Sequence, residues 1–128
     1  MKKFRVTVTR TTEYEVTVDD TKWGSEAQKD FERYMWDLPH YSSDDGNPDV
    51  EAAGGFAKAL AEQSIRLGVN TFIEGFGKCG TDKEIVDYWN SQPHHKDDQY
   101  VDGLYISEED DDIESKIEEM EDRTTSRI

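Results

Sequence analysis

Alternation of apolar and polar side chains near the start of the chain constrains its fold most strongly. In the segment KKFRVTVTRTTEYEVTVD, the apolar residues stand at even positions: Phe4, Val6, Val8, Tyr14, Val16 and Val18. A period of two is typical of a β-strand with one buried face. The parity is unbroken through residues 9–13, which predicts either a hairpin with an odd-length loop or one long bent strand. We favour the hairpin within residues 3–19, because an unbroken strand would span roughly 50 Å, too long for a small domain.

The chain has the length of one compact domain and a composition that allows only a modest core. Of its 128 residues, 34% are hydrophobic and 35% are charged. No apolar run approaches the roughly 20 residues that span a bilayer, and the N-terminus lacks the apolar segment of a signal peptide. We therefore expect a cytoplasmic protein with a single domain over residues 1–122 and a frayed tail over residues 123–128.

Negative charge is concentrated in the later part of the chain. The formal net charge is −15. Residues 1–36 carry seven basic and seven acidic side chains, whereas residues 37–128 carry 8 basic and 23 acidic ones. A field of this sign repels nucleic acids and anionic membranes and attracts basic protein surfaces. We therefore expect neither direct nucleic-acid binding nor membrane binding.

Three segments carry the start signals of helices: residues 25–37, 47–67 and 81–91. The first and the third open with capping boxes, and the second opens with Asn47-Pro48 and stops at Gly68. A strand is expected over residues 69–74. The dipeptide Asp102-Gly103 predicts a short hairpin over residues 99–106.

The acidic segment EEDDDIESKIEEMED, residues 108–122, is predicted to form the last helix. Ile113, Ile117 and Met120 follow one another at helical spacing and would face inward. The segment carries ten carboxylates and one lysine, most of which would point outward. Together with the other elements it predicts an α+β fold, in which three to four helices, the acidic C-terminal one included, pack on a small, mainly antiparallel sheet.

The run Gly75–Gly80 matches G-x-G-x-x-G, the pattern of dinucleotide-binding loops. In such a loop the glycines lead directly into the helix that receives the phosphates. Here Thr81 already caps the helix, and Asp82 and Glu84 in its first turn would repel phosphate. We expect no nucleotide to bind, and the role of the loop stays open.

Metal and catalytic motifs are incomplete. Residues Asp98–Glu109 match part of a calcium-binding EF-hand loop, but Tyr100 stands where a carboxylate belongs, so calcium binding stays open. His94-His95 has no partner at a diagnostic spacing, and neither has Cys79. We expect no cofactor, no metal and no enzymatic activity.

The charge pattern indicates a binding protein whose partner is basic. Carboxylates at i, i+3 and i+4 lie about 5–6 Å apart along a helix, a separation similar to that of DNA phosphates. The predicted partner-binding residues are Glu108, Asp111, Asp112, Glu114, Glu118, Glu119, Glu121 and Asp122, with Asp44 and Asp45 in an earlier loop. In size and composition, though not in motif, the chain is similar to phage-encoded inhibitors that imitate DNA and block restriction or CRISPR proteins. That likeness implies a protein that blocks the basic nucleic-acid groove of a partner.

A second hypothesis is a protein–protein interaction or assembly module, such as an antitoxin-like partner or a small structural subunit. Apolar and aromatic side chains would then make the contact, and a homo-oligomer is possible. Salt separates the two hypotheses, because an electrostatic contact weakens with salt and an apolar one does not.

Overall fold

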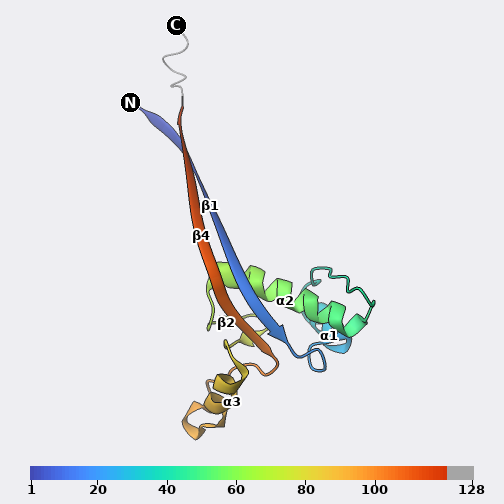
Figure 1. Cartoon of the computed structure of the whole chain (residues 1–128). Coiled ribbons are helices and arrows are strands. Elements are labelled where there is room, and N and C mark those ends of the chain that lie inside the picture. Colours follow the sequence, from blue (N-terminus) through green and yellow to red (C-terminus); the bar gives the residue numbers. More distant parts are fainter. Residues whose placement is uncertain (121–128) are drawn as a thin grey trace. The chain divides into compact units, whose positions relative to one another are not determined.

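A computed structural model describes residues 1–120 of the chain. Its elements in chain order are β1 (Lys3–Val18), α1 (Ser25–Tyr34), α2 (Pro48–Leu67), β2 (Phe72–Ile73), β3 (Gly77–Lys78), α3 (Lys83–Ser91), a 3-10 turn (Pro93–His95) and β4 (Leu104–Met120) (Figure 1). The described part of the chain is α+β, as predicted, with three α-helices and two small antiparallel sheets. None of the helices within residues 1–120 has both the length and the apolar character needed to cross a membrane.

The chain divides into two compact units. Of the described residues, 1–13 and 109–120 form the first unit, and 14–108 form the second. β1 and β4 each contribute residues to both units. The single domain over residues 1–122 stays a prediction, and the frayed tail expected over residues 123–128 lies outside the described residues.

β1 is one strand of 16 residues, so the hairpin favoured for residues 3–19 is wrong and the long-strand alternative holds. Its hydrogen-bonding partner is β4, a strand of 17 residues from the other end of the sequence. We expected a strand of this length to be too long for a small domain. It does not have to fit inside one, because only its part from Tyr14 onward belongs to the second unit.

The acidic helix predicted for residues 108–122 is also wrong, because the chain is a strand up to Met120. A separation of four residues is about one helical turn and also two repeats of a strand, so Ile113 and Ile117 fit both periods. Electrostatics favours the strand. Carboxylates three and four residues apart repel one another on a helix, whereas the strand brings some of them against basic side chains of β1.

The second unit has a core that is rich in aromatic rings. Phe56 and Leu60 of α2 are completely buried. The Phe56 ring makes edge contacts with Phe31 of α1 at 5.5 Å and with Trp23 at 5.2 Å between centroids. The β4 residues Leu104 and Ile106 complete this core, and Tyr14, Val16 and Val18 of β1 pack against it. The even positions of β1 therefore face a core in this part of the strand, as the alternation predicts.

The local signals define the ends of α2 and only approximate those of the other helices. Asn47 caps α2 by accepting a hydrogen bond from the Asp49 backbone NH, and Gly68 ends the helix with a φ of 87°. The Ser25 hydroxyl, predicted to cap α1, donates instead to Asp49 at 2.8 Å. In α3 the cap is Asp82 rather than Thr81, since its carboxylate accepts from two backbone NH groups of the first turn.

The glycines of Gly75–Gly80 serve a tight turn and close packing. β2 and β3 pair through this turn, with Phe72 opposite Lys78 and Ile73 opposite Gly77. Gly75 and Gly77 both have φ near +90°, a region that L-residues avoid. The strand expected over residues 69–74 is thus reduced to two residues.

The hairpin predicted for residues 99–106 is wrong. The segment before Leu104 is not a strand, and the Val101 backbone NH donates to Lys78. The Gly103 carbonyl accepts a hydrogen bond from the Asp19 backbone NH at 2.8 Å, so Asp102-Gly103 leads into β4 instead of turning between two local strands.

Candidate functional site

The described part of the first unit is a two-stranded ribbon, which we define as residues 1–13 and 109–120. Two side-chain contacts define one of its faces: Lys2 pairs with Glu119 at 2.8 Å, and Arg10 Nε donates to Asp111 Oδ1 at 2.8 Å. Side chains alternate along a strand, and those that meet across a sheet share a face.

One face of the ribbon therefore holds the even-numbered residues of β1 and the odd-numbered residues of β4. The other face holds the odd residues of β1 and the even ones of β4. The Arg5–Glu118 pair, 3.7 Å apart, joins an odd and an even residue and agrees with this assignment.

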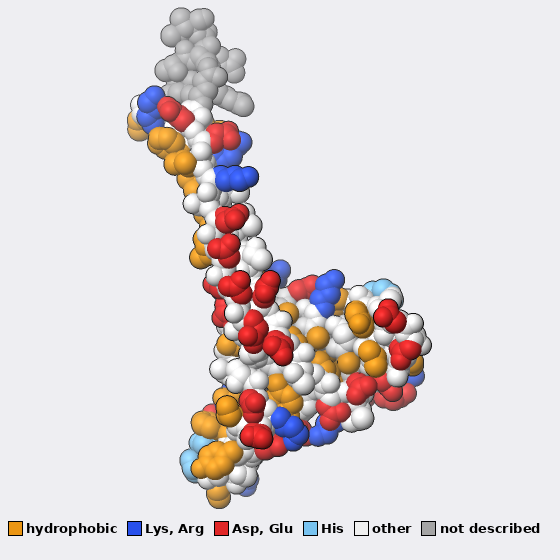
Figure 2. All heavy atoms as spheres, viewed as in Figure 1, with side chains coloured by type: hydrophobic (Ala, Val, Ile, Leu, Met, Phe, Trp, Pro, Cys, Tyr) orange, Lys and Arg blue, Asp and Glu red, His pale blue; other side chains and the backbone are white. Residues whose placement is uncertain are grey.

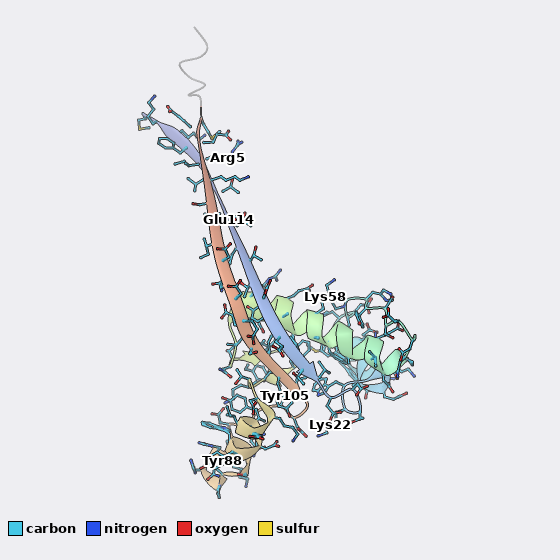
Figure 3. The ribbon with its side chains drawn as sticks, viewed as in Figure 1. Arg5, Lys22, Lys58, Tyr88, Tyr105 and Glu114 are labelled. Atoms are coloured by element: carbon cyan, nitrogen blue, oxygen red, sulfur yellow. The ribbon has the colours of Figure 1, made fainter. Side chains whose placement is uncertain are left out.

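The face with the odd residues of β1 and the even residues of β4 carries a row of acidic side chains. Asp110, Asp112 and Glu114, which we call the acidic row, are all exposed. Alternate residues of a strand are about 6.6–6.8 Å apart, so the row presents negative charges at a regular interval. In Figure 2, acidic side chains follow one another along the ribbon. Glu114 lies on β4, and Arg5 lies nearer the N-terminal end of β1 (Figure 3).

The strand beside the acidic row offers hydroxyl groups. Thr7, Thr9 and Thr11 occupy the odd positions of β1 on the same face, and all three are exposed. The basic residues of this face are Lys3 and Arg5, which precede the threonines, and Lys116, which follows Glu114 at the next even position of β4. Arg5 already pairs with Glu118. The acidic row thus lies beside uncharged threonines and keeps a net negative charge, with Lys116 at its end.

The other face of the ribbon is apolar in its middle. We call Phe4, Val6, Val8, Ile113 and Ile117 the apolar face; their exposed fractions range from 52% for Phe4 to 70% for Ile117. The sequence predicted that these residues are buried, and this expectation is wrong for all five. Ile113 and Ile117 do share a face, as predicted, but neither packs into a core.

Asp111 is fixed by hydrogen bonds on the edge of the apolar face. Its carboxylate accepts from Arg10 Nε and, at 2.9 Å, from the Thr12 hydroxyl. These contacts, that of Arg10 first, lower the pKa of Asp111 below its ordinary value. Asp111 is thus a paired residue of the ribbon and does not belong to the acidic row.

The structure separates the residues that the sequence placed in one partner-binding surface. Asp112 and Glu114 belong to the acidic row and Glu118 shares their face, whereas Asp111 and Glu119 lie on the opposite face in ion pairs. Glu108 belongs to the second unit. Glu121 and Asp122 lie outside the described residues.

The loop residues Asp44 and Asp45 belong to the second unit. Asp45 accepts hydrogen bonds from the Ser43 hydroxyl at 2.9 Å and from the Asn47 backbone NH at 3.2 Å. These bonds, the backbone one first, lower its pKa and give Asp45 a local role before α2. That the two residues extend the acidic surface stays a prediction.

Asp110 is a member of the row that sequence reasoning missed. A helical period set the expected outward positions, and that period gives no reason to group Asp110 with Asp112 and Glu114. Equal parity is the signal that would have found it, once the segment is taken as a strand.

The remaining candidate residues have structural roles. Cys79 is buried, and burial raises the pKa of its thiol to about 11, so it is a poor nucleophile at neutral pH. The His95 ring stacks on Trp89 at 3.4 Å between centroids. In the EF-hand-like segment, Asp98 pairs with Lys78 and Asp102 with Lys22. Within residues 1–120, no group of three or more acidic, His or Cys side chains is placed to hold a metal ion.

No family model, curated protein or solved structure matches the chain. The two faces of the ribbon are the surfaces that a functional proposal has to explain.

Proposed function

We propose that the protein is a non-enzymatic, cytoplasmic binding protein that blocks the basic nucleic-acid-binding groove of a partner protein. The acidic face of the ribbon makes the contact. The observation that carries this proposal is the acidic row, Asp110, Asp112 and Glu114, beside a strand of threonines. An anti-restriction or anti-CRISPR inhibitor would act in this way.

The geometry of the row suits a groove that binds phosphates. Its carboxylates repeat every 6.6–6.8 Å or so on one side of an extended strand. Successive phosphates of a DNA strand rise by about 3.4 Å along the axis while winding around it, so their direct separation is larger than the rise. Lysine and arginine side chains spaced for such phosphates can reach successive carboxylates of the row.

The stability of the ribbon does not explain why three carboxylates stand in a row on one of its faces. Neighbouring like charges on one face of a sheet oppose its formation, and cross-strand pairs of opposite charge stabilise it. The ribbon uses such pairs at Lys2–Glu119 and Arg10–Asp111, on its apolar face. The acidic row has threonines beside it instead, which supports a role in binding.

Charge reversal of the row tests the proposal. The variant Asp110→Lys, Asp112→Lys, Glu114→Lys is compared with a control that makes the same change of charge in the second unit: Glu62→Lys, Glu74→Lys, Asp97→Lys. All six carboxylates are exposed. Each protein is used to capture partners from a nuclease-treated cell lysate, and captured proteins are eluted with duplex DNA.

The proposal expects the wild type and the control to hold a basic protein that DNA displaces, and the row variant to lose it. Binding should also weaken steeply between low and high salt, because exposed charges are screened. Equal capture by the row variant, or a captured protein that DNA does not displace, would refute the role of the acidic row.

The alternative, an interaction or assembly module, is supported by a different observation. Five large apolar side chains stand exposed on the other face of the ribbon. A partner held by that face would stay bound at high salt, and reversal of the acidic row would leave it in place.

A further inference from the structure

The apolar face of the ribbon is a contiguous exposed patch and not a set of scattered apolar residues. It consists of Phe4, Val6, Val8, Ile113 and Ile117. With every member more than half exposed, the five side chains present on the order of 500 Å² of surface. That is near the upper end for the largest apolar patch of a monomeric protein. The patch lies on a two-stranded ribbon, which has only marginal stability in water without further packing.

We propose that a second copy of this chain covers the apolar face, so that two ribbons pack face to face in a symmetric dimer. The inference goes beyond the proposed function, since it concerns the opposite face and a different partner. Two packed faces would remove on the order of 1,000 Å² from water, which is the lower limit for a specific interface.

The charges that flank the apolar face are self-complementary. On the side of β1 they are basic: Lys2, the residue before the strand, lies at one end and Arg10 at the other. On β4 they are acidic, Glu119 at the first end and Asp111 at the second. A two-fold axis parallel to the strands places β1 of one copy over β4 of the other, so each basic residue meets an acidic one at both ends.

Other ways of stacking two copies are less favourable. A two-fold axis that lies between the faces and runs across the strands would place β1 over β1 in reverse. Lys2 of one copy would then approach Arg10 of the other, and Asp111 would approach Glu119. Like charges set against each other in an interface oppose association, so the charge pattern selects the axis parallel to the strands.

The dimer leaves the proposed inhibitory surface free. Because the acidic row lies on the opposite face of the ribbon, the two copies would carry their rows on the outer faces of the four-stranded stack. Dimerisation depends on apolar contact and tolerates salt, whereas groove binding depends on charge. The two proposals can therefore fail separately.

Sedimentation velocity over a range of concentrations tests the dimer. The variant Val6→Lys, Val8→Lys is compared with Thr7→Lys, Thr9→Lys, which adds the same charge to the same strand on the opposite face, beside the acidic row. We expect the wild type and the threonine variant to dimerise. We expect the valine variant to dimerise roughly 100-fold more weakly, because two unpaired charges would enter an apolar contact. Near-ultraviolet circular dichroism of the Trp23 and Phe56 cluster checks the fold of the second unit in each variant.

Cross-linking determines the orientation. Copies with Phe4→Cys and copies with Val8→Cys, both in a Cys79→Ala background, are treated with a short bismaleimide alone and after mixing. The axis parallel to the strands sets residue 4 of one copy about 11 Å from residue 4 of the other, so each protein should cross-link alone. The crossed arrangement puts residue 4 over residue 8 and separates equal residues by about 13 Å along the strands, so only the mixture would cross-link efficiently.

A wild type that stays monomeric up to several hundred micromolar would overturn the proposal and leave the face to another partner. A valine variant that dimerises as tightly as the threonine variant would overturn it as well. Cross-linking of the mixture, with neither single protein cross-linked alone, would refute the orientation argued from the charges.

Discussion

Gly77 gives the sharpest test of how the Gly75–Gly80 turn is built. Its φ is +85°, and a Cβ at this position would stand 2.5 Å from Cγ2 of Val101. Alanine at position 77 therefore meets two separate difficulties, an unfavourable backbone conformation and a collision. Gly68 offers a matched control, because its φ is +87° and no atom lies within 4 Å of its added Cβ.

The two difficulties have different expected magnitudes. A sparsely populated backbone conformation with φ near +85° costs an L-residue about 1–3 kcal/mol. Overpacking adds about 1–3 kcal/mol where the neighbours cannot move away. We therefore expect Gly68→Ala to lower the free energy of unfolding by about 1–3 kcal/mol and Gly77→Ala to lower it by about 2–6 kcal/mol.

A double-mutant cycle with Val101→Ala isolates the collision. Shortening Val101 removes the atom that the new Cβ would meet, so the double variant should be more stable than the sum of the single effects by about 1–3 kcal/mol. Urea unfolding followed by tryptophan fluorescence measures all four proteins. The reasoning fails if the two single effects add, or if Gly77→Ala is no more destabilising than Gly68→Ala.

Three further predictions concern single side chains. Asn47→Ala should lower the free energy of unfolding by about 0.5–2 kcal/mol in urea titrations, because it removes the cap of α2. Cys79 should react with a thiol reagent at pH 8 only after denaturation, since burial raises its pKa to about 11; fast reaction of the folded protein would contradict its burial. For Asp111, the folded pKa lies below the unfolded value of about 3.9, so the stability from its hydrogen bonds is present above that pH and is lost as the pH falls through the folded pKa. Asp111→Asn should therefore reduce the loss of melting temperature on acidification, and an unchanged acid profile would count against the Arg10 contact.

The sequence predicts elements well where the determining interactions are local. α2 begins at Pro48 and ends before Gly68 because a cap, a proline and a glycine act within a few residues of the helix ends. β4 could not be predicted in this way, because its partner strand is distant. Arg10 and Asp111 are separated by 101 positions, and no local pattern announces that contact. The four-residue spacing of Ile113 and Ile117 fits a helix as well as a strand, and it led to the prediction of a helix where the chain forms a strand.

The sequence predicts where the acidic segment lies, but it does not predict which of its carboxylates share a face. Counting carboxylates is enough to locate the segment. Which of them share a face depends on whether the segment is a helix or a strand. As a strand it has Asp111 on the apolar face and Asp110 in the acidic row. The apolar face was hidden for a related reason, since alternation predicts a shared face and does not say whether anything covers it.

The pairing of β1 with β4 has a consequence for synthesis on the ribosome. At about 5–20 residues per second, the 101 positions between Arg10 and Asp111 correspond to a delay of about 5–20 s. For that time the alternating valines of β1 have emerged while the strand that pairs with them does not yet exist. An unpaired edge of this kind can pair with another chain. A chaperone that holds nascent β-strands, or a neighbouring nascent copy on the same messenger, would meet residues 3–13 before β4 does.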